Sequence, residues 1–474
     1  MRKVFVFSLF LVLLSGWGGV FAQTETDSVY RGQEACSPCE PIEKVWLPCE
    51  PIESDWFCCR SSRINNSCDP CDAIGSDPCD AVCDSWKTFN PFKNKRHRKS
   101  FFDNIEVFGW VQGGIYTNSR GNTIARSRAQ NFNGREVAQF DETSGNGNLL
   151  STVHSTDFQI NQVWLGVKKE ADGQHGLDWG FAAEGFFGTE AFFAQSWGDA
   201  KFDYGWQDGD YHTSIPQLYA QLAYGDLSVK LGKFETVLGF EALRAPDFFF
   251  YSHSYLFLVE PTSHSGAFFE YTPNDRLSLG AGYITGADAS FENAYDDHGF
   301  LGTISYQLTD KLNLSYAVMY NRNGYGAYHD TDDDDFNRYG LSGTNIYLHT
   351  VTASYDISDK WNYSLQWDYN DIKTRNGGDH EYMYGISNYL TYQFNDRWGI
   401  GFRAEWVNVD ASYGYGNDLS NYTLGLNWKP YTNISLRPEI RYDYSASKDA
   451  DDKPFNNGKN RDQFSGGIGG VVSF

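Results

Sequence analysis

Two short runs of the chain carry residue types that could perform nucleophilic chemistry. Ser252-His253-Ser254 and His264-Ser265 place hydroxyl and imidazole groups within a few residues of each other. A hydrolase needs a nucleophile, a base and a group that orients the base to converge in space, and closeness in sequence does not show that convergence. We therefore predict no enzyme and no catalytic residue, and we interpret His253 as a hydrogen-bonding residue within a loop.

An acidic run could bind a divalent cation. It comprises Asp330 and Asp332 to Asp335, but the sixth and twelfth positions of a calcium loop are occupied by Asp335 and Leu341 instead of glycine and glutamate. The favoured alternative is a solvated outer loop that attracts cations. The sequence thus predicts neither a metal bound by this run nor a cofactor.

All nine cysteines lie between Cys36 and Cys83. Two Cys-x-x-Cys pairs have spacing that zinc sites use, but the export that the amino terminus indicates (next paragraph) favours disulfides. The odd number leaves at least one thiol free, metal-bound or paired between chains. The candidates for disulfides or metal binding are Cys36, Cys39, Cys68, Cys71, Cys79 and Cys83.

The amino terminus has the pattern of a secretory signal peptide over residues 1–22. Arg2 and Lys3 precede an apolar run, and Ala22 ends a stretch with small residues suited to cleavage. We predict a Cys-rich periplasmic segment over 23–90. A basic linker over 91–100 follows; it is either simply solvated or contacts anionic headgroups or cell wall.

Composition excludes several classes of protein. The formal net charge is -23, which argues against nucleic acid as a partner because an acidic surface repels phosphate. Mean hydropathy is -0.51. Beyond the first 22 residues there is no apolar run near the ~18 residues of a spanning helix. An aromatic content of 17% is too high for a largely disordered chain.

From Phe101 onward, apolar and polar residues alternate with period two, which predicts strands. In 361–370, Trp, Tyr and Leu side chains alternate with Asn, Ser, Gln and Asp. A membrane barrel directs the apolar face to lipid and the polar face to the lumen. Aromatic residues at strand ends, short turns such as 274–276 and 309–311, and a terminal strand ending in Phe474 favour this reading. That terminal strand resembles the signal read by the barrel-assembly machinery.

We therefore predict an all-β fold, a transmembrane antiparallel β-barrel over 101–474, preceded by the Cys-rich irregular segment. Its sixteen strands, an even number, leave a lumen that side chains alone cannot fill, so an aqueous channel follows. The expected spans are 105–117, 157–169, 177–188, 216–224, 227–237, 264–272, 276–285, 299–308, 311–321, 345–356, 360–371, 382–394, 397–409, 420–429, 433–444 and 462–474.

The connection over 238–263 is too apolar for a loop in water, so we expect it to fold inside the barrel and narrow the pore. The opposite wall, eight strands away, carries charges of both signs. An acidic loop facing an arginine-bearing wall would orient polar solutes, and local pairing of charges along their own strands is the open alternative. The predicted constriction residues are Glu241, Arg244, Asp247, Glu260, Arg403, Glu405, Arg437, Glu439 and Arg441.

The central stretch also resembles a known family. Gly232-Lys233-Phe234, the run 250–255, Glu260-Pro261 and His264-Ser265-Gly266 are similar to the OmpL-like β-barrel porins. The resemblance covers roughly 101–474 and implies passive diffusion of solutes, without indicating which ones. Homotrimers are usual among sixteen-strand porins, and the resemblance implies one here.

Two functions remain open at this point. The first is an outer-membrane porin for small hydrophilic solutes and ions, with a mild preference for cations because the chain is acidic. The second is a structural envelope protein whose barrel anchors the Cys-rich module, which would then have a disulfide-linked or cell-wall partner. The Cys-rich segment distinguishes the two functions, because disulfide bridges between chains are expected only for the second.

Overall fold

The structure is a computed structural model that describes residues 104–119, 126–130, 136–140, 157–196, 202–203, 207–208, 211–291, 298–322, 344–374, 380–409, 418–446, 453–456 and 459–474. The signal peptide, the cysteines, the basic linker and the acidic run at 330–335 lie outside these residues. Among those described, no helix is both long enough and apolar enough to cross a membrane.

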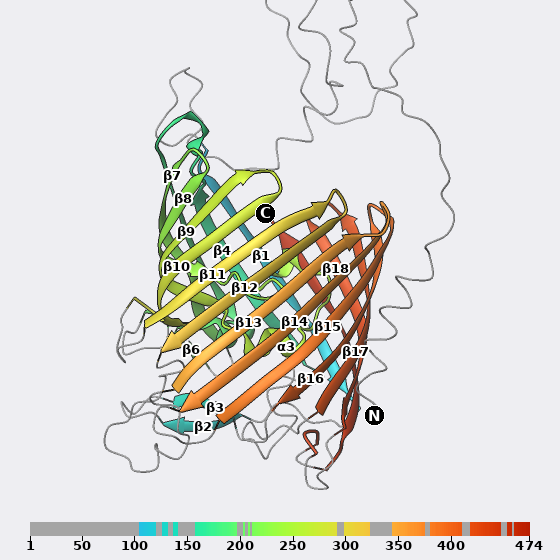
Figure 1. Ribbon diagram of the computed structural model, residues 1–474. Coiled ribbons are helices and arrows are strands. Elements are labelled where there is room, and N and C mark those ends of the chain that lie inside the picture. Colours follow the sequence, from blue (N-terminus) through green and yellow to red (C-terminus); the bar gives the residue numbers. More distant parts are fainter. Residues whose placement is uncertain are drawn as a thin grey trace, which may run out of the picture. The chain divides into compact units, whose positions relative to one another are not determined.

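Sixteen antiparallel strands of the described chain form a closed barrel, as predicted (Figure 1). Each pairs with the next along the chain, and the first pairs with the last. The strands are β1 (Glu106–Asn118), β4 (Phe158–Lys169), β5 (Asp178–Gly188), β7 (Tyr211–Tyr224), β8 (Leu227–Glu235), β9 (Ser263–Asn274), β10 (Leu277–Ala287), β11 (His298–Thr309), β12 (Leu312–Arg322), β13 (Thr344–Asp356), β14 (Trp361–Thr374), β15 (His380–Asn395), β16 (Trp398–Val409), β17 (Asp418–Tyr431), β18 (Ile434–Ser445) and β19 (Asp462–Ser473).

Short strands and helices lie in the connections between the barrel strands. The two-residue β6 (Gln207–Asp208) pairs with β7, and β2 (Arg126–Gln130) pairs with β3 (Glu136–Phe140) in a separate hairpin. The short helices are η2 (Gly173–His175), η3 (Glu190–Ala194), η4 (Ala245–Asp247) and α3 (Tyr255–Val259). The last two belong to the connection between β8 and β9.

The seam between β1 and β19 closes the ring. The pairing runs from Trp110 opposite Ser473 to Asn118 opposite Ser465. The last residue extends it: Gly109 N donates to Phe474 O at 3.0 Å, and Phe474 N donates to Gly109 O at 2.9 Å. A Cβ on Gly109 would lie 2.6 Å from the Phe474 ring, so glycine is what lets this ring lie across the seam.

Side chains alternate between the two faces as the sequence predicts. On β11, Phe300, Ile304 and Tyr306 remain exposed on the outside, whereas Leu301 between them is fully buried. An apolar outer surface of this kind suits lipid. The inner wall is less uniformly polar than expected, because inward side chains of β8 to β14 form an apolar cluster. Its largest members are Phe234, Phe268, Ile284, Leu301, Met319, Ile346, Leu348 and Ile372.

One strand begins earlier than predicted. The sequence reading started it at residue 216, whereas β7 begins at Tyr211. Pro216 lies inside the strand at a register shift opposite Glu184 to Phe186. A bulge removes the need for the missing proline N–H, so the strand continues through a residue that normally indicates a boundary.

Candidate pore constriction

Residues 236–262 connect β8 to β9 and are called the inward loop below. The part of the loop that leaves β8 is its first limb, and the part that returns to β9 is its second limb. Thr236 N donates to Thr262 O at 2.9 Å, which closes the base of the loop. From there the loop reaches lumen-facing side chains of β4, β14, β15, β16 and β18. It therefore lies within the barrel and contacts the wall opposite its own strands.

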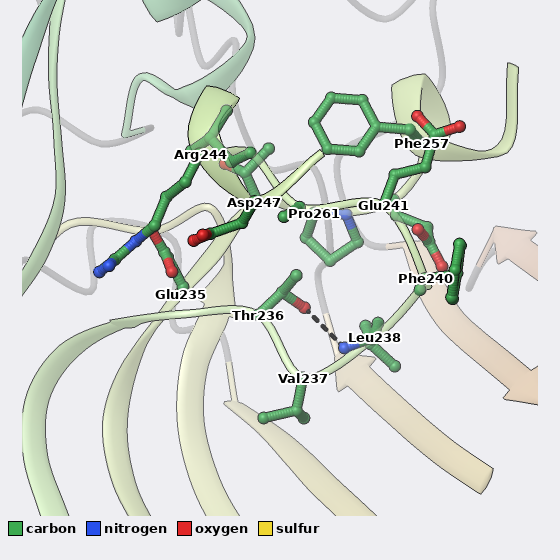
Figure 2. A pocket seen from close by; sticks show the side chains of 15 residues that line it. Glu235, Thr236, Val237, Leu238, Phe240, Glu241, Arg244, Asp247, Phe257 and Pro261 are labelled. Carbon is green, nitrogen blue, oxygen red and sulfur yellow. Dashed lines mark hydrogen bonds and ion pairs between the residues drawn. The ribbon is translucent and has the colours of Figure 1, made fainter. Parts of the chain in front are cut away.

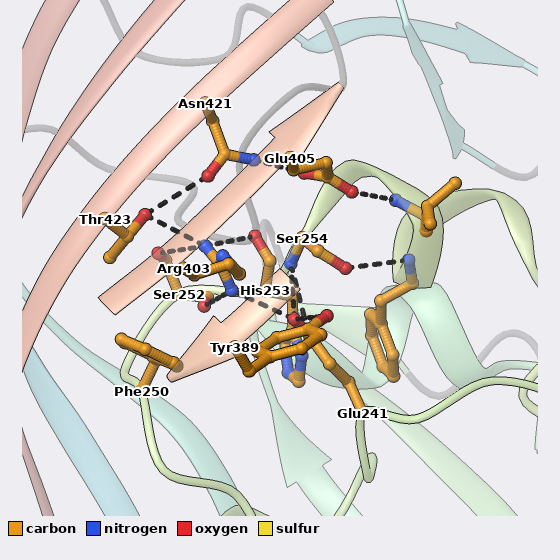
Figure 3. Close-up of polar contacts among 12 residues, drawn as sticks. Glu241, Phe250, Ser252, His253, Ser254, Tyr389, Arg403, Glu405, Asn421 and Thr423 are labelled. Carbon is orange, nitrogen blue, oxygen red and sulfur yellow. Dashed lines mark hydrogen bonds and ion pairs between the residues drawn. The ribbon is translucent and has the colours of Figure 1, made fainter. Parts of the chain in front are cut away.

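Arg403 of β16 is the main anchor for the loop (Figure 3). Its side chain is fully buried and donates to Glu241 Oε1 at 3.0 Å, to Ser252 O at 2.8 Å and to His253 O at 3.2 Å. Tyr389 OH also donates to Glu241 Oε1, at 2.9 Å. The buried charge is thus satisfied by acceptors from both limbs of the loop.

Glu241 is held in its ionised form. Burial alone would raise the pKa of this carboxyl, but Arg403, His253 and the backbone N–H of Ser254 together lower the pKa to about 2. His253 Nδ1 lies 2.9 Å from Glu241 Oε2, and its ring stacks on Phe257 with centroids 3.8 Å apart. His253 is therefore part of the loop's own packing.

The acids of the wall bind the backbone of the loop. Glu405 of β16 accepts from Tyr255 N at 2.8 Å and from Leu256 N at 2.9 Å. These are N–H groups of the first turn of α3, which have no partner within the helix. Glu439 of β18 accepts from Tyr251 N at 2.9 Å. Both predicted acids thus hold the loop against the wall.

The remaining arginines show both of the expected patterns. Arg441 pairs with Asp443 on its own strand at 2.7 Å, which is the local pairing that the sequence left open. The same side chain donates to His253 O at 2.7 Å. Arg437 donates to Phe250 O at 3.4 Å. Arginines of the wall therefore hold carbonyl groups of the loop as well as acids.

The sequence predicted acidic and basic groups facing each other across the pore, and the structure differs. Glu241 and Arg403 are in direct contact. The loop comes this close because glycines on the wall leave room for its rings. A Cβ would lie 2.5 Å from Phe249 at Gly401, 3.0 Å from Phe250 at Gly425 and 2.3 Å from Tyr251 at Gly469.

A cavity of about 380 Å³ lies between the two limbs of the inward loop (Figure 2). Arg244 pairs with Glu235 through Nε at 3.0 Å and with Glu184 of β5 through Nη2 at 2.5 Å. Asp247 is exposed and lines the cavity. The charged residues of its lining are Glu235, Glu241, Arg244, Asp247 and Glu260. Acids therefore outnumber bases around this space.

The polar partners of the loop that sequence reasoning missed include Gln366, Asp368 and Tyr389. Gln366 and Asp368 are two residues apart on β14 and were recognised only as the polar face of a strand. The residue types could have indicated this contact, because Gln366 and Asp368 are an amide and an acid that face the lumen at mid-strand, on the wall that an inward loop would reach.

The sequence over residues 104–474 matches the family model described as "Putative beta-barrel porin-2, OmpL-like". The chain belongs to this family. The resemblance inferred from the central stretch is thereby confirmed, and so is the predicted antiparallel β-barrel. This OmpL-like protein is an outer-membrane porin, and family and fold favour a channel over an enzyme.

Three solved structures are similar to this chain. The anion-selective porin from Comamonas acidovorans is 13% identical, with 78% of this chain and 99% of that chain covered and a TM-score of 0.48. The channel DcaP of Acinetobacter baumannii is 12% identical, with 78% and 97% covered and a TM-score of 0.49. Salmonella typhi OmpF is 14% identical, with 78% and 97% covered and a TM-score of 0.47. No curated protein matches the sequence.

Proposed function

We propose that this OmpL-like porin allows passive diffusion of small hydrophilic solutes and ions, and that the inward loop narrows its pore. The observation that carries the proposal is the docking of residues 236–262 on the far wall through Arg403, Glu405 and Glu439. A sixteen-strand ring is too wide for its wall side chains to fill. A loop held across it sets the size of the passage.

The charges around the loop cavity support a preference for cations. Arg244 is the one base in its lining and is already paired with two acids, while Asp247 is exposed to the cavity. A net negative lining attracts cations and repels anions. The preference should weaken at high salt, because screening shortens the range of the field.

Single-channel recording tests this function. The refolded mature protein is placed in a planar bilayer under a salt gradient. Discrete conductance steps with a reversal potential on the cation side support the proposal. A silent bilayer would contradict it if the same preparation is folded, as judged by its heat-modifiable mobility on gels.

A second role is favoured by the nine cysteines within residues 36–83. In this role, cleavage after residue 22 leaves a periplasmic segment that crosslinks the barrel to another chain or to the cell wall. A ladder on non-reducing gels that collapses with reductant is the expected result. Deleting residues 23–99 should remove the ladder and leave conductance unchanged, and the absence of any ladder would contradict crosslinking.

Two partners of the barrel are also proposed. The terminal strand ending in Phe474 is the segment we expect the barrel-assembly machinery to bind, and the resemblance to sixteen-strand porins favours a homotrimer within outer-membrane lipid. Chemical crosslinking in native membranes should give a band of three barrels, and a monomer alone would contradict the trimer.

A further inference from the structure

The second limb of the inward loop ends at a buried acid. Glu260 is 8% exposed and lies against lumen-facing side chains of β13 and β14. Its Oε1 accepts from Gln366 Nε2 at 3.0 Å and from Thr350 Oγ1 at 3.3 Å. Neither donor carries a charge, so these contacts do not neutralise an ionised carboxylate.

A second buried acid shares the same amide donor. Asp368 is fully buried, and its Oδ2 accepts from Gln366 Nε2 at 2.7 Å. The carboxyl groups of Glu260 and Asp368 also lie within hydrogen-bonding reach of each other. Asp368 Oδ1 is buried without a hydrogen-bond partner in the structure. Ionising both of two acids that lie this close together and this deeply buried has a high free-energy cost.

The surrounding charges do not supply a counter-ion. Within the described chain, no ion pair joins either acid to a lysine, arginine or histidine. Of the other charged groups facing the cavity, Arg244 is engaged by Glu235, and Glu241 is engaged by Arg403. Asp247 would add further negative charge. The pair must therefore be neutralised by a proton or by a bound cation.

The orientation of Gln366 distinguishes these possibilities. Its Oε1 accepts from Phe240 N at 2.9 Å, which directs the amide NH₂ group at both acids. N–H hydrogens between two carboxyl groups would repel a metal ion but suit a pair with one proton. A proton held by one of the two carboxyl groups also supplies a donor between groups that otherwise only accept. We propose that Glu260 and Asp368 share one proton that pins the inward loop to the wall, so that docking weakens as pH rises.

The shared proton controls both limbs of the loop. Gln366 binds the first limb at Phe240 and the second limb at Glu260. Gly239, with φ +79°, lies so close that a Cβ there would be 2.1 Å from Glu260 Oε2. Removing the proton leaves two negative charges at this junction, which favours release of both limbs. Because the cavity lies between them, release should widen it.

The sign of the pH dependence follows from the difference between docked and free loops. Burial, and then Asp368, raise the pKa of Glu260 well above its ordinary value of 4.5. A free loop in water would return this acid to its ordinary value, so docking takes up a proton. Docking is therefore strongest below the ordinary carboxyl range and is lost as pH rises, by up to about tenfold per pH unit for one proton.

Infrared spectroscopy of the full-length protein tests the shared proton without any need for conduction. We expect wild type at neutral pH to show the carbonyl band of a protonated carboxyl group that E260Q lacks. D359N, which alters an exposed acid in the turn between β13 and β14, should keep the band. A band that E260Q retains would overturn the proposal. So would a wild-type band that appears only after a chelator removes divalent cations, because a metal would then occupy the site.

The effect on the channel rests on the proposed function and is measured separately. Wild-type conductance should increase between pH 5 and pH 9, whereas E260Q, whose amide can donate to Asp368 without a proton, should show no such increase. D359N should behave as wild type. If E260Q kept the wild-type pH response, the proposal that a shared proton pins the inward loop would be overturned. A silent bilayer together with the expected infrared result would contradict the proposed channel function. The shared proton would then still be supported.

Discussion

At the scale of single residues, Arg403 decides how the loop is held. A fully buried guanidinium is costly unless its donors find acceptors, and Arg403 finds a carboxylate and two backbone carbonyls. These three acceptors come from the inward loop, and Thr423 of β17 accepts from the same side chain at 3.2 Å. One side chain of the wall therefore joins parts of the loop that are distant from each other along its length.

Arg403→Ala should release the loop and destabilise the barrel. The change leaves Glu241 buried without its partner, which typically costs about 3–5 kcal/mol. We expect noisy, larger conductance steps and a lower temperature for the change in gel mobility. Arg397→Ala in the exposed turn between β15 and β16 is the matched control. Quiet channels of wild-type size in Arg403→Ala would contradict the role of this anchor.

Asp247→Asn should reduce the preference for cations without changing the fold. The Asp247 carboxylate is exposed to the cavity, so its removal lowers the local negative potential and leaves packing intact. The reversal potential under a salt gradient should move toward zero, most clearly at low salt. Asp359→Asn should leave it unchanged, and equal shifts in the two variants would show that the loop cavity does not set selectivity.

At the scale of elements, the sequence was sufficient for the strands and for the unusual loop. Period-two alternation predicted all sixteen strands because side-chain direction in a strand is a local property. The apolar content of 238–263 predicted an inward loop, because a cluster of aromatic side chains is buried against other parts of the molecule. Direct contact between Arg403 and Glu241 was not predictable, since it depends on how far the loop reaches. Nor was the course of β7 through Pro216, which depends on a bulge.

Replacing residues 246–256 with a short Gly-Ser linker should enlarge the pore. The replacement removes Tyr251 and Tyr255, whose N–H groups bind Glu439 and Glu405, and leaves the strands intact. Conductance should rise well above that of wild type while the protein still folds. A folded variant with unchanged conductance would mean that the narrowest part of the pore lies elsewhere.

At the scale of the whole molecule, the seam that closes the barrel extends to Phe474. Phe474 forms two backbone hydrogen bonds with Gly109 and covers it with its ring. A closed ring has no unpaired strand edge, which is what lipid requires of a spanning sheet. The end of the chain therefore contributes to a property of the entire barrel.

Deleting Phe474 should lower the yield of folded barrel more than Phe464→Ala does. Both changes remove an exposed aromatic side chain from the same end of the chain, but only the deletion also removes the two seam hydrogen bonds. The heat-modifiable fraction after refolding measures the yield. Equal yields for the two variants would show that the terminal residue adds nothing beyond its apolar surface.

The seam between β1 and β19 also determines when the barrel can enclose a pore. Tyr116 and Ser465 touch across it although they are 349 residues apart in the chain. Contacts between such distant residues form late, since the intervening chain must first be ordered. The passage therefore has no wall on one side until synthesis, export and strand addition are complete. A nascent or truncated chain would present an open sheet, and the cell's permeability barrier would be altered only by finished molecules.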